Sequence, residues 1–152
     1  MAALMALITV SCSDDDEDDD ELGNWVESST FDGNSRANSV SFTIGTKGYL
    51  VTGYDGDDYL ADTWEYNSDD DYWVQKAVFP GVGRSGAVGF SINGNGYIGT
   101  GYDGSEQKDF WKYDVATDSW EQSVGFGGEK RQDASVFTID EIAYIGLGIH
   151  NG

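Results

Sequence analysis

Several residue types are scarce in this chain of 152 residues, which has one cysteine, one proline, one histidine and eight lysines and arginines. A single thiol, Cys12, cannot form an internal disulfide bond. One proline excludes a collagen-like or proline-rich sequence. A lone histidine, His150, has no identified partner with which to activate a nucleophile, so no Ser-His-Asp set is present.

Basic residues are outnumbered, with 28 acidic side chains and a net charge of −20. Eight of the acidic residues lie between Asp14 and Glu21, and without them the net charge is −12. Nucleic acids are bound by lysine and arginine that displace counterions from phosphates. The charge therefore argues against a nucleic-acid partner and leaves neutral sugars, cations and basic proteins open.

The chain has enough apolar residues for a packed domain, because 39% are hydrophobic and 14% aromatic. The apolar stretch Met1–Val10 is too short for a membrane span, which needs about twenty residues. Together with Ser11-Cys12 and the acidic run it resembles a bacterial lipoprotein signal, although no basic residue precedes it. The resemblance implies lipidation of Cys12, a membrane anchor through that lipid, and a surface-exposed or periplasmic place at the outer membrane. The alternative is a frayed segment with an incidental cysteine.

This interpretation divides the chain into a signal segment (1–12), an acidic tether (13–23) and a folded part (24–152). Eight consecutive carboxylates repel one another, so the tether is expected to be extended and solvated. The run lacks the alternating aspartates and the glycine of an EF-hand loop, and no metal site or cofactor is predicted.

The folded part repeats itself with a period of 48 and then 47 residues. The positions that carry this period are Trp25, Trp73 and Trp120; Arg36, Arg84 and Arg131; and Gly53, Gly101 and Gly148. Apolar residues alternate within each repeat, as in strands. Turns at 45–47 and 93–95 separate the first two strands, and strands at 62–67, 109–114, 73–75 and 120–122 form a second pair. Four short antiparallel strands in about fifty residues are typical of a β-propeller blade.

The repeats resemble kelch repeats: an arginine opens the first strand, a Gly-Tyr second strand ends in glycine, the third strand reads Asp-x-Trp-x-Tyr-Asp and the fourth contains a tryptophan. We therefore expect an all-β fold of kelch-type β-propeller blades, four-stranded and antiparallel, in an incomplete propeller of two full blades plus half a third. Residues 24–27 would form an outer strand. Kelch repeats usually place two glycines after the second strand, whereas this chain has Thr52-Gly53 and Thr100-Gly101. Because two and a half blades do not close a propeller, we expect either a longer protein or self-association through exposed blade faces.

The kelch layout implies that the loops after the second strands share a ligand-binding face. The candidate ligand-binding residues in these loops are Tyr54, Asp55, Asp57, Asp58, Tyr59, Tyr102, Asp103, Ser105 and Glu106. Aromatic rings beside carboxylates suit sugars, basic peptides or a calcium ion, and solvated turns are the alternative.

The arginines Arg36, Arg84 and Arg131 have two interpretations. They are expected to pair with blade carboxylates such as Asp62 and Asp109, and the alternative is an anion site in the central channel. The repeated tryptophans are expected to pack between blades.

The favoured function is a non-catalytic binding module for a glycan or a protein on a cell-envelope lipoprotein. The alternative is a kelch-type carbohydrate-active enzyme, epimerase- or oxidase-like, whose catalytic residues lie in further blades. No cysteine lies in the repeats to form the copper site of kelch-type oxidases. A purely structural scaffold is the third possibility.

Overall fold

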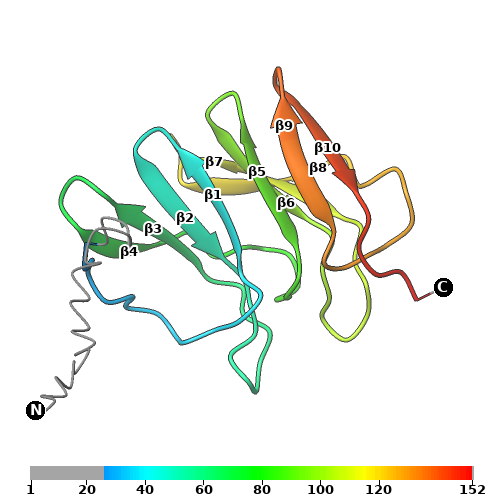
Figure 1. Cartoon of the computed structure of the whole chain (residues 1–152), viewed down its shortest axis with the longest axis horizontal. Coiled ribbons are helices and arrows are strands. Elements are labelled where there is room, and N and C mark those ends of the chain that lie inside the picture. Colours follow the sequence, from blue (N-terminus) through cyan, green and yellow to red (C-terminus); the bar gives the residue numbers. More distant parts are fainter. Residues whose placement is uncertain (1–25, 152) are drawn as a thin grey trace, which may run out of the picture.

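The computed structural model describes residues 26–151, which form ten strands and no helix (Figure 1). The first four-stranded sheet contains β1 (Val40–Ile44), β2 (Lys47–Val51), β3 (Thr63–Asn67) and β4 (Tyr72–Lys76). The second contains β5 (Val88–Ile92), β6 (Asn95–Gly99), β7 (Phe110–Asp114) and β8 (Ser119–Ser123). The hairpin β9 (Ser135–Ile139) and β10 (Ile142–Gly146) follows. The predicted all-β fold of two four-stranded antiparallel units and half a third is confirmed.

Each sheet is a simple meander in which every strand pairs with the next one along the chain. The register repeats between sheets, because Phe42 pairs with Tyr49 as Phe90 pairs with Tyr97. The two-residue turns between these strands use glycine at positive φ, namely 59° at Gly45 and 72° at Gly94. The expected hairpins at 45–47 and 93–95 are thus present.

The outer strand expected at 24–27 is not formed in the part of the chain that the structure describes. Asn24 and Trp25 lie outside the described residues, and Val26 and Glu27 belong to no strand. A strand needs a neighbour for its backbone groups, and no described residue pairs with these two. The segment is held instead at Ser29, whose N–H donates to Asp71 Oδ1 at 2.8 Å.

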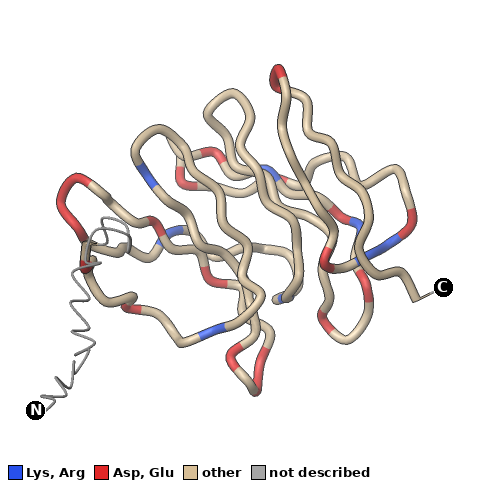
Figure 2. The backbone as a smooth tube through the Cα atoms, in the orientation of Figure 1, with Lys and Arg blue, Asp and Glu red and all other residues tan. Residues whose placement is uncertain are grey.

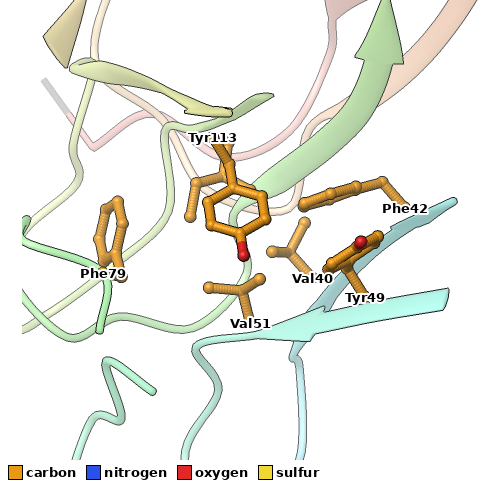
Figure 3. Packing of buried hydrophobic residues seen from close by; sticks show 7 residues of the cluster. Val40, Phe42, Tyr49, Val51, Phe79 and Tyr113 are labelled. Atoms are coloured by element: carbon orange, nitrogen blue, oxygen red, sulfur yellow. The ribbon is translucent and has the colours of Figure 1, made fainter. Parts of the chain in front are cut away.

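Backbone hydrogen bonds between the segments that precede the first strands join consecutive units. The Gly86 N–H donates to the Asn38 carbonyl at 3.0 Å, and the Asp133 N–H donates to the Gly86 carbonyl at 2.8 Å. The core between the first two units combines Phe42 and Tyr49 with Ile98 and Tyr113 from the second (Figure 3). The Tyr49 and Tyr113 rings lie 5.6 Å apart, and both side chains are buried. The second unit therefore packs face to face on the first, as blades of a propeller do.

An aromatic motif that recurs in both four-stranded units packs on their outer strands. Phe79 lies after β4 and contacts two tryptophans edge-on, Trp111 at 5.7 Å and Trp120 at 5.4 Å. The Trp120 indole N–H also donates to the Ala77 carbonyl at 3.1 Å. The same arrangement in the first unit places Phe31 against its two tryptophans. Trp111 and Trp120 thus pack against the segment that connects the two units. Trp64 and Trp73 pack against the segment that precedes the first unit.

Both residues of the Thr-Gly pairs after β2 and β6 have positive φ, the region that favours glycine. The φ angles are 61° and 117° at Thr52 and Gly53, and 59° and 98° at Thr100 and Gly101. A Cβ on Gly101 would lie 2.8 Å from the Ser85 carbonyl oxygen, which explains why glycine is retained there. The threonines are fully buried, and this backbone conformation is strained for a β-branched residue.

The segments 1–12, with Cys12, and 13–23 lie outside the described residues. Across residues 26–151 no helix is long and apolar enough to span a membrane.

Candidate functional site

Two loops on the same side of the molecule carry the candidate ligand-binding residues. The loop after β2 and the loop after β6 extend together beyond the sheets at the bottom of Figure 1. Acidic residues mark the tips of both loops in Figure 2. The two loops therefore lie on the same side of the molecule.

Backbone hydrogen bonds fix the loops to the segments that connect the blades. Tyr54 exchanges two hydrogen bonds of 2.9 Å with Ala37, and Tyr102 exchanges hydrogen bonds of 2.8 and 2.9 Å with Ser85. The Gly53 N–H donates to the Arg84 carbonyl at 2.8 Å, which ties the first loop to the entry of the second unit. Both tyrosines are thus held at equivalent positions by the main chain.

Three tyrosine rings form a row across the two loops. The Tyr54 and Tyr59 ring centroids lie 5.0 Å apart with an interplanar angle of 44°. Tyr59 then meets Tyr102 of the next loop edge-on at 6.0 Å and 73°. All three rings are partly buried, and burial beside the other two phenols raises the pKa of Tyr59 above its ordinary value. The row offers aromatic surface from two adjacent units.

Carboxylates surround this row of tyrosines. Asp55 Oδ1 accepts the N–H groups of Asp58 at 2.8 Å and Asp57 at 3.0 Å, and these bonds lower the pKa of Asp55. Asp103 Oδ1 accepts the Ser105 N–H at 3.1 Å and a Gln107 amide N–H at 3.0 Å. Asp55 and Asp103 therefore shape the turns of the two loops that carry the rings.

Glu106 takes the place of Tyr59 in the second loop but faces away from the tyrosines. Its backbone bridges Tyr102 as that of Tyr59 bridges Tyr54. The side chain is 7% exposed and accepts the Asn151 amide N–H at 2.7 Å, with Lys130 Nζ at 3.9 Å. The structure thus brings together the three tyrosines and their neighbouring aspartates, whereas Glu106 is directed toward the third unit.

Arg36 and Arg84 form internal ion pairs, as the first interpretation expected. Arg131 instead donates to backbone carbonyls, those of Glu129 and Leu147. Arg84 donates to both oxygens of Asp109, with Nη1–Oδ1 at 2.5 Å and Nη2–Oδ2 at 3.0 Å. It also donates to the Val82 and Thr100 carbonyls and lies over the Phe79 ring. Arg36 binds Asp62 in the same way.

Burial raises the pKa of Asp109, but the hydrogen bonds from Arg84 and Trp111 outweigh it, so the pKa lies below its ordinary value. Because the Arg84 side chain is 1% exposed and its donors are used within the protein, these contacts support a structural role.

Two further polar residues of the loops were not identified from the sequence. Asn34 donates from Nδ2 to Asp55 Oδ2 at 3.3 Å, and Gln107 donates to Asp103. Neither residue recurs in the repeat, since Val82 stands where Asn34 would align and Leu60 where Gln107 would, so the repeat gave no signal for them.

This face presents aromatic rings and carboxylates. Tyrosine rings stack on the apolar faces of sugars or on lysine and arginine side chains, and carboxylates accept hydrogen bonds from hydroxyls and cationic groups. Among the described residues no group of three or more histidine, cysteine, aspartate or glutamate side chains is arranged to hold a metal ion. No protein-family model matches the chain, and no curated protein matches it either.

Proposed function

We propose that this chain is a non-catalytic binding module of kelch-repeat type, whose ligand lies along the row formed by Tyr54, Tyr59 and Tyr102. The observation that carries the proposal is the contact between Tyr59 and Tyr102, because it joins loops from two units into one surface. A continuous surface across neighbouring blades supports recognition of an extended ligand. If each loop were only a solvated turn, no contact between the rings of the two loops would be required.

The negative charge and the tyrosine rings of the two loops indicate the class of ligand. Aspartates flank the tyrosines, and the chain as a whole is strongly acidic. Neutral glycans and basic protein segments suit such a surface, whereas phosphorylated ligands and nucleic acids are repelled. With a lipid on Cys12 and the acidic tether behind it, the module would sit at the outer membrane of a bacterial cell envelope, facing the surface or the periplasm.

The test compares the full chain with the double variant Tyr54→Ala/Tyr102→Ala on immobilised panels of neutral glycans and of lysine- and arginine-rich peptides. We expect the parent to be captured by at least one panel and the double variant to bind at least about tenfold more weakly, as for aromatic anchors of interfaces. Tyr72→Ala is the matched control, because Tyr72 is an exposed tyrosine at the start of β4.

Capture of the double variant equal to that of the parent contradicts the proposal, as does a parent that binds neither panel. Circular dichroism of each variant establishes that the fold is retained. A loss shared by Tyr72→Ala shows that the effect does not belong to the loop face.

A further inference from the structure

The segment that enters the second unit passes between the two loops of the tyrosine row. The Arg84 N–H donates to the Leu60 carbonyl at 3.3 Å, and the Gly53 N–H donates to the Arg84 carbonyl at 2.8 Å. The next residue, Ser85, exchanges two hydrogen bonds with Tyr102. In Figure 1 this segment turns into β5 between the two loops. The residues just before Arg84 therefore lie beside both loops.

Val82 is an exposed apolar residue of this segment. It is 60% exposed, and its carbonyl accepts the Arg84 Nε–H at 3.0 Å. Its neighbour Gly83 packs directly on the first loop, because a Cβ on Gly83 would clash with the Tyr59 carbonyl oxygen. The backbone is thus held against Tyr59, with Val82 at the surface next to it.

The repeat indicates which loop the Val82 side chain faces. Val82 aligns with Asn34, whose side chain donates to Asp55 Oδ2 at 3.3 Å. The carbonyl of each residue accepts the Nε–H of the arginine two positions later at 3.0 Å, so the two backbones are arranged alike. Asp103 is the equivalent of Asp55, and Val82 is therefore directed toward the second loop beside Asp103. The third unit has Glu129 at this position, so Val82 is the apolar member of the three.

The Asp103 carboxylate offers an acceptor oxygen beside the rings. Three hydrogen bonds from Ser105 and Gln107 all reach Asp103 Oδ1, so Oδ2 accepts none within residues 26–151. Burial is the main cause of the raised pKa of Tyr59, and the Asp103 carboxylate adds to this shift after the two neighbouring phenols. Asp103 and Val82 thus lie on the side of the row where the two loops meet.

The two loops carry no positive charge of their own. Residues 53–60 and 101–107 contain no lysine, arginine or histidine and five carboxylates, namely those of Asp55, Asp57, Asp58, Asp103 and Glu106. Asp57 and Asp58 are exposed, and in the part of the chain that the structure describes their carboxylates accept no hydrogen bond. These charges attract a cation to the rings.

From these contacts we propose that Val82, with Tyr59 and Tyr102, binds the aliphatic stem of a lysine or arginine side chain whose charged end pairs with Asp103. The inference rests on the proposed function and selects a basic protein segment among its ligands. Lysine and arginine combine an apolar stem with a cation that binds tyrosine rings. A sugar hydroxyl can hydrogen bond to an amide such as that of Asn34, whereas the Val82 side chain offers it no partner.

The test measures dissociation constants of the full chain for a lysine-rich and an arginine-rich peptide by fluorescence anisotropy. Val82→Asn installs the residue of the first unit, and we expect at least about fourfold weaker binding, the effect of one lost methylene contact. Val78→Thr is the matched control and is expected to bind as the parent does. Val78 is 61% exposed in the same segment, and Thr30 is its equivalent in the first unit.

A second pair of peptides carries shortened basic residues, in which a single methylene bears the ammonium or guanidinium group. These peptides keep the charge but have no stem to reach Val82. We therefore expect Val82→Asn to cause no further loss of their binding, because the interaction that it removes is already absent. Urea midpoints equal to that of the parent establish that both valine variants retain the fold.

A third measurement uses the unaltered chain and follows its valine methyl signals by nuclear magnetic resonance. The Val82 methyl signals are expected to shift on addition of the basic peptide, and those of Val78 to stay in place. Unmoved Val82 signals overturn the proposal, as does a Val82→Asn variant that binds both basic peptides as tightly as the parent. Capture of the parent by neutral glycans and by neither basic peptide also overturns it, but leaves the proposed function standing. Capture by no glycan and no peptide overturns both.

Discussion

The ion pair between Arg84 and Asp109 gives the most informative stability prediction. The Arg84 side chain is 1% exposed and that of Asp109 is 25% exposed, and Asp109 also accepts the Trp111 indole N–H at 2.7 Å. Asp109→Asn keeps the shape of the side chain but leaves a buried guanidinium without its counter-charge. Removing one partner of a buried pair costs about 3–5 kcal/mol. Because Asp109 is partly solvated, we expect a loss of about 3 kcal/mol in the free energy of unfolding.

The assay is urea denaturation followed by tryptophan fluorescence, in which the midpoint falls and the slope is unchanged. Glu121→Gln is the matched control, because it removes the exposed pair that Glu121 forms with Lys112 at 2.9 Å. An exposed pair contributes at most about 1 kcal/mol. The reasoning is refuted if the losses in unfolding free energy of the two variants differ by less than about 0.5 kcal/mol, which is the accuracy to which independent mutational effects add.

Two further predictions concern pH and the membrane. Asp71 accepts hydrogen bonds from the Ser29 N–H and the Tyr66 hydroxyl, which lower its pKa to about 2. Because the unfolded pKa is about 3.9, this stabilisation is complete above about pH 5 and is lost as the pH falls toward 2. Asp71→Asn should therefore flatten the fall in unfolding free energy between pH 5 and 2 in urea titrations, and an unchanged slope refutes the assignment. Cys12→Ala should release the protein from the membrane fraction of expressing bacteria, and retention of the variant there refutes lipidation at Cys12.

The strands could be predicted from the sequence because the same residues recur in register. The repeat predicted the third and fourth strands of both four-stranded sheets to within about one residue, whereas the outer strand predicted at 24–27 is not formed among the described residues. The pairing of Arg84 with Asp109 also followed from the repeat, since both residues have equivalents in the first unit. The strands and this ion pair arise from contacts within one unit or with the adjacent unit, so the residues that form them recur in the repeat.

Contacts between units were harder to predict. Phe31, Phe79 and Phe126 share the period of the arginines, but a phenylalanine in an irregular segment has no strand or helix pattern to mark it. The left-handed backbone of Thr52 and Thr100 was also unexpected, because β-branched residues avoid it in isolation. Tertiary packing imposes it, since both threonines are fully buried.

The candidate site could be predicted only in part. The sequence placed Tyr54 and Tyr102 at matching loop positions, and the shared face followed from the blade layout. The contact of Tyr59 with Tyr102 could not be predicted, because the second loop has Glu106 at the position of Tyr59 and is one residue shorter. The direction of the Glu106 side chain depends on Asn151, which is distant in the sequence.

The most direct test of the central claim maps the ligand onto the chain residue by residue. Backbone amide shifts of the full chain are recorded by nuclear magnetic resonance during titration with a neutral oligosaccharide and, separately, with a lysine- and arginine-rich peptide. If the tyrosine row is the binding site, the shifts caused by one of these probes concentrate in residues 53–60 and 101–107. Shifts concentrated at β10 and Phe126, or no shifts with either probe, contradict the account.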